Sequence, residues 1–309
     1  MRRPRTVLQK LTDPLVYTGL LGVSGLVNLL GARAGYAIAS ASARGWHRLF
    51  PERLKVIDRN LEFAFPEGLD DSTREKIRFE CCRHALANLI EGFVRDRLVT
   101  PKNWREFADM DPVLEEQLQN PHPNGLAILS AHLGSWEMGL YFCGAFGKPV
   151  SPVMRRLDNP YLDRMSNKKR ARFGATVIPK TGALRGILQE LRSGGRVAIM
   201  ADQSAPIEEG FLPFFGVRAS TYQKYAGLLV RQECPVLFCV CLRDSFRFRF
   251  RFETRVLEVP ADGNREERAT GLIQNYLAAL EETARKYPEQ YLWMHKRFKL
   301  RPDGEDSPY

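Results

Sequence analysis

The fold of this chain is decided by the stretch Gly125-Leu-Ala-Ile-Leu-Ser-Ala-His-Leu-Gly-Ser-Trp-Glu-Met-Gly-Leu-Tyr-Phe142. Its first part, Gly125–Ser130, is apolar and predicts a buried strand, and Ser135–Phe142 predicts a helix directly behind it. His132 and Glu137 lie five residues apart, and on one straight helix their side chains would diverge by about 140°. They can meet only if His132 ends the strand or lies in the loop while Glu137 lies in the first helical turn. Open α/β sheets place their chemistry at such carboxyl ends of strands.

Strands and helices alternate along the rest of the chain. Apolar, strand-like runs are expected near residues 126–130, 149–154, 174–178, 196–201, 235–242 and 246–256. Helices are expected near residues 53–60, 71–98, 135–145, 160–171, 182–192, 220–232 and 265–286. This alternation predicts an α/β fold with a mostly parallel central sheet flanked by helices on both faces.

One expected strand has its own pattern, Phe246-Arg-Phe-Arg-Phe-Arg-Phe252. The strict period of two predicts one apolar and one charged face, as in an antiparallel or edge strand. Its three arginines either form a solvated edge or present a stripe to a phosphate group, and the sequence leaves both interpretations open.

The amino-terminal segment is uncharged from Pro14 to Ala32, with basic residues on both sides. Its length permits a membrane span, but glycines and polar side chains interrupt it, and the flanking charges give no clear orientation. We expect a re-entrant or interfacial membrane helix; a true span and a helical hairpin of the core are the alternatives. We therefore divide the chain into a membrane-associating helical segment, 1–48, and an α/β domain, 49–309.

Composition narrows the class of partner. The chain has 309 residues, 44% hydrophobic and 27% charged, as in a globular protein with a substantial core. A formal net charge of +10 and a pI of about 9.4 favour an anionic membrane surface, a phosphorylated substrate or an acidic protein. No nucleic-acid-binding motif is present. The six cysteines show neither zinc spacing nor a disulfide framework, which favours a reducing compartment, and Cys239 and Cys241 are expected in the core.

His132 has the chemistry of a general base. A neighbouring carboxylate would fix its tautomer and stabilise the imidazolium that forms when it takes a proton. No G-x-S-x-G elbow supplies a nucleophile, and the other histidines show no metal-ligand pattern. This leaves a base that activates an external hydroxyl for direct attack on a thioester. Taken alone, the pair of His132 and Glu137 also fits a purely structural contact.

More polar and basic groups lie near the ends of other expected strands. They are Arg155, Asn159, Arg170, Asp202, Gln203 and Arg218. Each basic residue singly fits a solvated surface, but convergence at one sheet edge would form a site for phosphate or carboxylate groups. Asp202 either orients another side chain or caps the segment that follows it.

These segments, in this order, resemble the bacterial lipid A biosynthesis acyltransferase family, also called the lauroyl/myristoyl acyltransferases. The family lies within the lysophospholipid and glycerolipid acyltransferases, which share an HxxxxD/E motif. The matching pieces cover nearly the whole chain: Asn60–Pro66, Ala131–Glu137, Arg155–Pro160, Arg170–Gly174, Gly194–Gln203, Pro213–Thr221 and Pro288–Pro302. The chain departs from the family pattern at Ser135, Arg156, Ser204 and Phe298. These departures leave the identity of the acceptor open.

The resemblance implies transfer of an acyl chain from an acyl thioester, on acyl carrier protein or coenzyme A, to a hydroxyl of a glycolipid such as a lipid A precursor. His132 would be the general base and Glu137 its partner, without metal or cofactor. Substrate would be bound by Arg155, Asn159, Arg170, Asp202, Gln203 and Arg218. We expect a hydrophobic tunnel that sets the acyl chain length to involve Trp136, Met138, Leu140 or Phe142.

The same resemblance implies a place at the bacterial inner membrane, with the α/β domain on the cytoplasmic face. A basic surface would steer an acidic carrier protein toward the site. The alternatives are acylation of phosphatidylinositol mannosides or other lysophospholipids, a thioesterase, and a non-catalytic lipid-binding protein on the same fold.

Overall fold

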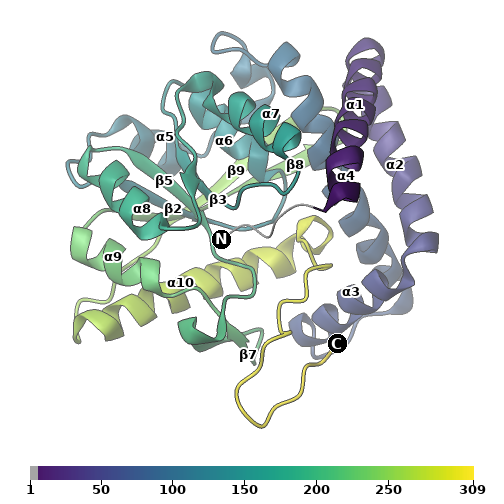
Figure 1. The fold of residues 1–309 in the computed structure, drawn as a ribbon. Coiled ribbons are helices and arrows are strands. Elements are labelled where there is room, and N and C mark those ends of the chain that lie inside the picture. The colour runs from purple at the N-terminus through teal and green to yellow at the C-terminus, as the bar shows by residue number, and fades with distance from the viewer. Residues whose placement is uncertain (1–5) are drawn as a thin grey trace.

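The computed structural model describes residues 6–309 and contains the expected alternation of strands and helices (Figure 1). The first five residues of the expected segment 1–48 lie outside this range. The helices are α1 (Val7–Leu30), α2 (Ala32–Leu49), α3 (Pro51–Ala64), α4 (Asp71–Leu98), α5 (Pro112–Gln119), α6 (Trp136–Ala145), α7 (Pro160–Arg170), α8 (Ala183–Arg192), α9 (Lys224–Gln232) and α10 (Arg265–Lys286). The strands are β1 (Ala108–Asp109), β2 (Leu126–Ser130), β3 (Ser151–Met154), β4 (Ile178–Pro179), β5 (Arg196–Met200), β6 (Phe211–Phe214), β7 (Val217–Ser220), β8 (Val236–Ser245) and β9 (Arg249–Val256).

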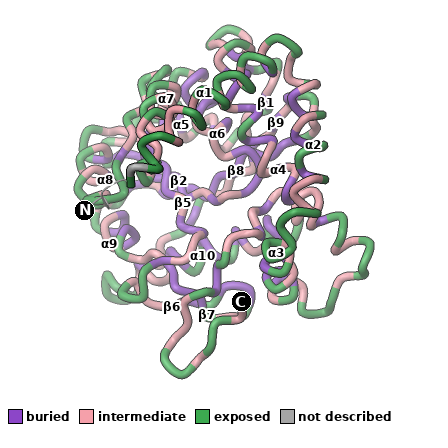
Figure 2. The backbone as a smooth tube through the Cα atoms, turned by 45° about the vertical axis from the view of Figure 1, so that its right-hand side comes forward, coloured by how far each residue is buried: buried purple, intermediate pink, exposed green. Residues whose placement is uncertain are grey.

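The central sheet has seven strands in the order β1-β9-β8-β2-β5-β3-β4. Neighbouring strands are parallel except β8 and β9, which form an antiparallel hairpin. The apolar strand β2 lies at the centre, within the buried part of the backbone (Figure 2). Its side chains point alternately to the two faces of the sheet and belong to two hydrophobic cores. Ala127 and Leu129 pack on the side of α9 and α10, whereas Leu126 and Ile128 pack on the side of α6. The predicted mostly parallel sheet with helices on both faces is confirmed.

Several predicted boundaries shift in the structure. The strand expected at 174–178 is reduced to the two residues of β4, and the helix expected at 220–232 begins at Lys224. The small antiparallel hairpin of β6 and β7 was not expected. Phe215 and Gly216 have positive φ in the turn between the two strands. An alternation of apolar and polar residues does not predict such a turn.

The Phe-Arg alternation forms part of the β8–β9 hairpin. Phe246 and Arg247 belong to the turn, and β9 begins only at Arg249, after Phe248 at a φ of +62°. The buried rings of the pattern join the core on the α6 side, as the apolar face predicted. Arg249 pairs with Asp109, and Arg251 contacts Asp244, so these two cations have partners within the chain. The antiparallel strand is confirmed, and the solvated interpretation of the arginines is favoured.

Helices α1, α2 and α4 form a separate layer beside the sheet (Figure 1). Helix α2 approaches α4 closely because Gly35 has no side chain: a Cβ there would lie 2.5 Å from Ile90 Cγ2. Asn28 of α1 donates to the carbonyl of Phe93 in α4 at 3.1 Å. Helix α1 is long and apolar enough to cross a membrane by length and composition, and its exposed side chains include Leu8, Leu15 and Leu29. The boundary after residue 48 stays a prediction.

Candidate active site

His132 and Asp202 come together at the carboxyl edge of the sheet. Strands β2 and β5 are parallel neighbours, with Ser130 opposite Met200. Both strands end at this edge, and the second residue after each strand is polar: His132 after β2 and Asp202 after β5. His132 Nδ1 lies 2.9 Å from Asp202 Oδ1, and the His132 backbone N–H donates to Asp202 Oδ2 at 2.9 Å. The parallel register therefore pairs two residues that are 70 positions apart in the sequence.

The pairing fixes the imidazole of His132. Asp202 is buried, and burial alone would raise the pKa of its carboxyl group; the charge and hydrogen bonds of His132 instead hold that pKa below its ordinary value. An ionised Asp202 accepts a hydrogen bond from the Nδ1–H of His132, which leaves the lone pair of the neutral ring on Nε2. Gln203 Nε2 lies 3.4 Å from this His132 Nε2. The ring nitrogen that Asp202 does not contact, Nε2, is thus the one available to a reacting group.

Glu137 has other partners than the one expected for it. Its carboxylate accepts from Arg170 Nε at 3.1 Å and Nη2 at 2.5 Å, and Arg95 Nη1 lies 3.5 Å away. Burial raises the pKa of Glu137, but the two guanidinium groups outweigh it and lower the pKa below its ordinary value. The expectation that Glu137 orients the His132 ring is therefore corrected: Asp202 holds that ring, because it is the lateral neighbour of His132 in the sheet.

Arg95 was missed in the sequence, although a signal was present. It lies in the last turn of α4, four residues after Glu91, within the buried face of that helix. Two charged residues in a run of buried apolar side chains indicate ion pairs in the interior, because unpaired charges there are costly. The sequence could have singled out Glu91 and Arg95 as buried charges, but it could not have named Glu137 as the partner of Arg95.

The structure gives two other expected substrate-binding residues, Arg155 and Asn159, partners within the chain. Arg155 is exposed and pairs with Asp158 at 2.9 Å. Asn159 caps α7 through its side-chain oxygen and donates to the carbonyl of Asp13 in α1 at 2.9 Å. Substrate binding by these residues stays a prediction.

Arg218 lies on the β6–β7 hairpin. Its guanidinium contacts Glu305 of the carboxyl-terminal segment, and its side chain is exposed. A different residue of the hairpin, Ser220, contacts the segment after β5: its hydroxyl lies 2.9 Å from that of Ser204. The structure thus gives Arg218 a partner within the chain, and a contact with substrate stays a prediction.

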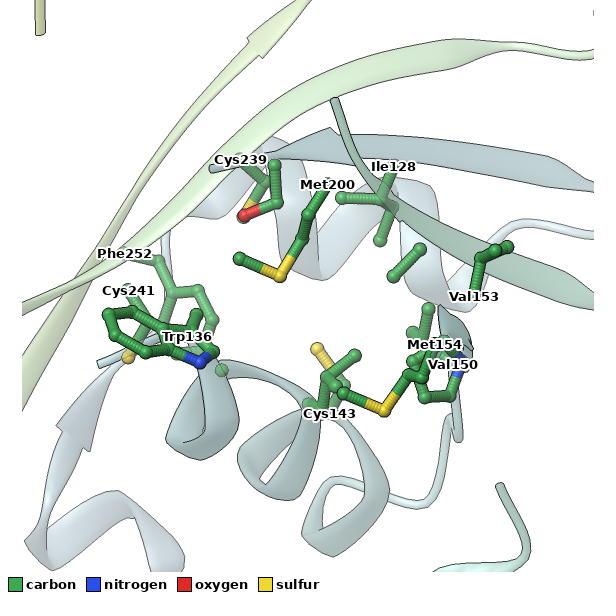
Figure 3. A pocket seen from close by; sticks show the side chains of 15 residues that line it. Ile128, Trp136, Cys143, Val150, Val153, Met154, Met200, Cys239, Cys241 and Phe252 are labelled. Carbon is green, nitrogen blue, oxygen red and sulfur yellow. The ribbon is translucent and has the colours of Figure 1, made fainter. Parts of the chain in front are cut away.

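An apolar cavity lies between the sheet and α6 (Figure 3). The ring of Trp136 lies against the ring of His132, with centroids 5.1 Å apart, and also lines the cavity. The other lining side chains come from six elements or the loops beside them and include Ile128, Leu140, Cys143, Val153, Met200, Cys239, Cys241 and Phe252. The cavity therefore lies between the sheet and α6, and Trp136 separates it from His132.

The lining of this cavity corrects part of the expected tunnel. Trp136, Leu140 and Cys143 line it at positions i, i+4 and i+7, which share one face of a helix. Met138 and Phe142 are fully buried on other sides of α6 and belong to the surrounding core. Of the four residues expected to line the tunnel, Trp136 and Leu140 therefore line the cavity, and Met138 and Phe142 do not.

A polar cleft of about 320 Å³ adjoins this cavity at Met154, which lines both. Its polar lining residues are Arg155, Arg156, Asp163, Asn167 and Thr176. Within residues 6–309, no group of three or more His, Cys, Asp or Glu side chains is arranged to hold a metal ion. All six cysteines are free and buried, and the core positions expected for Cys239 and Cys241 are confirmed.

Comparison with known proteins gives a consistent answer. The family model for bacterial lipid A biosynthesis acyltransferases matches residues 6–300. The lipid A biosynthesis lauroyltransferase of Escherichia coli (strain K12) is 26% identical over 94% of this chain and 93% of its own length. The lipid A biosynthesis palmitoleoyltransferase of the same organism is 28% identical over 83% of this chain and 82% of its own length. The chain, with the His132–Asp202 pair at one sheet edge and an apolar cavity next to Trp136, is an acyltransferase and belongs to the bacterial lipid A biosynthesis acyltransferase family.

Proposed function

We propose that this acyltransferase moves a fatty acyl chain from an acyl thioester to a hydroxyl of a lipid A precursor at the bacterial inner membrane. The observation that carries the proposal is the His132–Asp202 pair beside the apolar cavity. The names of the relatives support it, since they transfer lauroyl and palmitoleoyl groups in lipid A biosynthesis.

His132 acts as the general base in this proposal. Its Nε2 takes the proton of the acceptor hydroxyl while that oxygen attacks the thioester carbonyl carbon. Asp202 keeps the proton on Nδ1 and stabilises the imidazolium through the 2.9 Å contact. The tetrahedral intermediate then collapses, the carbon–sulfur bond breaks, and the imidazolium returns its proton to the leaving thiolate. No covalent enzyme intermediate is needed.

Glu137 acts through the arginines in this proposal. Arg95 and Arg170 oppose a single carboxylate, so the group carries a net positive charge in a largely buried place. Such preorganised charge stabilises negative charge that develops in a transition state or that a substrate phosphate carries. We propose that Glu137 holds Arg170 for this purpose. Gln203, beside His132 Nε2, contacts the reacting groups directly.

The cavity and the cleft supply the two substrate sites. The acyl chain enters beside Trp136, where each buried methylene contributes about 0.8 kcal/mol. The polar cleft next to Met154 suits the phosphorylated sugar headgroup, because Arg155 and Arg156 line it. The net charge of +10 favours an acidic carrier protein as donor and an anionic membrane surface.

Helix α1 supports a place on the membrane. Its exposed leucines form an apolar surface, while its other side packs on α4 and α7. A helix held along the protein in this way suits the interface of the cytoplasmic leaflet better than an independent span.

A transfer assay tests the proposed function. Purified protein is incubated with lauroyl thioesters of acyl carrier protein and coenzyme A, and with a lipid A precursor in mixed micelles. We expect acylated lipid from the wild type and a loss of at least about 10³-fold in His132→Ala, because the base is gone. His122→Ala is the matched control, since that histidine lies in the loop after α5 and contacts the Gln117 carbonyl of that helix.

The outcomes separate the alternatives. Undiminished transfer by His132→Ala contradicts the proposed base. Transfer only to phosphatidylinositol mannosides or lysophospholipids replaces the acceptor, and hydrolysis that ignores every acceptor indicates a thioesterase. No reaction with any pair of substrates contradicts the proposed function.

A further inference from the structure

A buried ion pair lies directly behind the catalytic segment. Glu91 of α4 and Arg243 of β8 are 1% and 2% exposed. Arg243 Nε donates to Glu91 Oε1 at 2.5 Å, and Nη2 donates to Oε2 at 2.8 Å. Removing two charges from water is costly, and such a pair seldom adds net stability. The hydrogen bonds of the pair are strong and directional in the low dielectric of the interior, however, so the pair can fix the positions of the segments it joins.

Two hydroxyl groups from distant segments complete the coordination of Glu91. Tyr36 OH of α2 donates to Oε1 at 2.8 Å, and Ser135 Oγ donates to Oε2 at 2.5 Å. Burial and the neighbouring carboxylate raise the pKa of the Tyr36 phenol, so it remains a donor. Glu91 is thereby a single acceptor shared by α2, by β8 and by the loop between β2 and α6.

Ser135 lies between His132 and Glu137 in the loop that joins β2 to α6. Hydrogen bonds to neighbouring segments fix the backbone of this loop. The N–H of Ser135 donates to the Cys241 carbonyl at 2.7 Å. Gly134, at a φ of +67°, approaches the same carbonyl so closely that a Cβ would lie 2.2 Å from it. Its own carbonyl accepts from Asn88 of α4 at 3.1 Å. The Ser135 hydroxyl adds the side-chain bond that ties this loop to the ion pair.

Arg243 is anchored from the opposite side. Its guanidinium also donates to His84 Nδ1, and burial together with Arg243 lowers the pKa of that histidine, which stays neutral and able to accept. Its backbone N–H and carbonyl both bond to the side chain of Gln290. The Gln290 carbonyl in turn accepts from the Gly134 N–H at 3.0 Å. The ion pair therefore cannot shift without moving the loop.

We propose that Glu91 is a positioning residue of the acyltransferase: through Ser135 and Tyr36 it ties the His132–Glu137 segment to the amino-terminal helices. This rests on the proposed function for its effect on rate. Helix α2 continues from α1, which carries the exposed leucines, after the single residue Gly31. The surface proposed to meet the membrane is thus joined to the catalytic segment through Tyr36, Glu91 and Ser135.

Variants that remove only a hydroxyl group test this inference. Glu91→Gln would leave Arg243 buried without a counter-charge, so Tyr36→Phe, Ser135→Ala and the double variant are used in the full-length chain. We expect each single variant to lower kcat about tenfold with an unchanged KM for the acyl donor, because a small misplacement of the base slows the reaction more than it weakens binding. Since both bonds act through one carboxylate, the double variant should be no slower than the slower single variant.

Amide hydrogen exchange gives a second measurement that does not depend on activity. In both single variants, residues 133–139 should exchange at least about tenfold faster, while Tm and exchange in β5 remain near wild type. The matched control is Tyr225→Phe, because the buried Tyr225 hydroxyl has no hydrogen-bond partner among the described residues. It should change neither measurement.

The outcomes distinguish this inference from the proposed function. A wild type without transfer overturns the proposed function, and the exchange data still decide whether Glu91 positions the segment. Unchanged exchange, a kcat within twofold of wild type, or a hundredfold loss in the double variant from two independent tenfold effects overturns the inference.

Discussion

At the scale of single residues, the decisive contact is His132 Nδ1 to Asp202. Asp202→Asn should turn an amide N–H toward that nitrogen, move the ring proton to Nε2 and remove the base. A comparable substitution in serine proteases costs about 10⁴-fold, and we expect a fall in kcat of about 10³-fold or more. Kinetics and the ¹⁵N chemical shifts of the ring nitrogens check this prediction.

Glu137→Gln is the comparison for that variant. It leaves the Asp202 contact in place, so the tautomer of His132 should remain that of the wild type, even where weakened contacts with Arg170 slow the reaction. A tautomer that changes in Glu137→Gln and persists in Asp202→Asn would restore the pairing first expected from the sequence.

At the scale of elements, α1 combines a packed side with an exposed apolar side. Leu15 and Leu29 are 70% and 81% exposed. Changing both to Glu should weaken binding to anionic phospholipid vesicles at least about tenfold. Each substitution removes an apolar side chain that would be buried in the membrane and adds a negative charge that the anionic lipids repel. Flotation of the purified variant with vesicles measures the effect.

The control for this prediction is Leu184→Glu. That leucine is exposed on α8, across the sheet from α1 (Figure 1), and its change should leave flotation unaltered. Equal loss in both variants would mean that charge alone, rather than the α1 surface, governs binding.

At the scale of the whole molecule, stability should depend on pH through a buried histidine. Burial lowers the pKa of His295 from 6.5 to about 4, and its neutral Nε2 accepts from the Ser204 N–H at 3.1 Å. Below pH 6.5 His295 binds a proton in the unfolded chain but not in the folded chain. The contribution of neutral His295 to the free energy of unfolding is therefore complete above pH 6.5 and is lost as the pH falls toward 4. The loss amounts to about 3 kcal/mol.

Urea unfolding of the wild type and of His295→Gln between pH 7 and pH 4 checks this prediction. The glutamine keeps an acceptor for Ser204 but does not titrate, so its stability should fall less over this range. His84 contributes with the same sign in both proteins and cancels in the difference. An identical fall in the two proteins would contradict the assignment to His295.

Much of the fold could be predicted because its signals are local. The apolar run 126–130 followed by the helix from Trp136 is a pattern of neighbours, and so is the alternation that predicts a parallel sheet. The β6–β7 hairpin escaped because its turn depends on positive φ values rather than on periodicity. The membrane segment and the family resemblance likewise depend on the order of residues alone.

The sequence by itself determined that His132 follows a strand and that the chain is an acyltransferase of this family. It also predicted a general base rather than a nucleophile. Only the tertiary structure decided which carboxylate serves His132, where Glu137 finds its arginines, and that Glu91 reaches Ser135. The physical reason is lateral pairing. Parallel register and helix packing bring together residues many positions apart, and no local pattern records which of them will face each other.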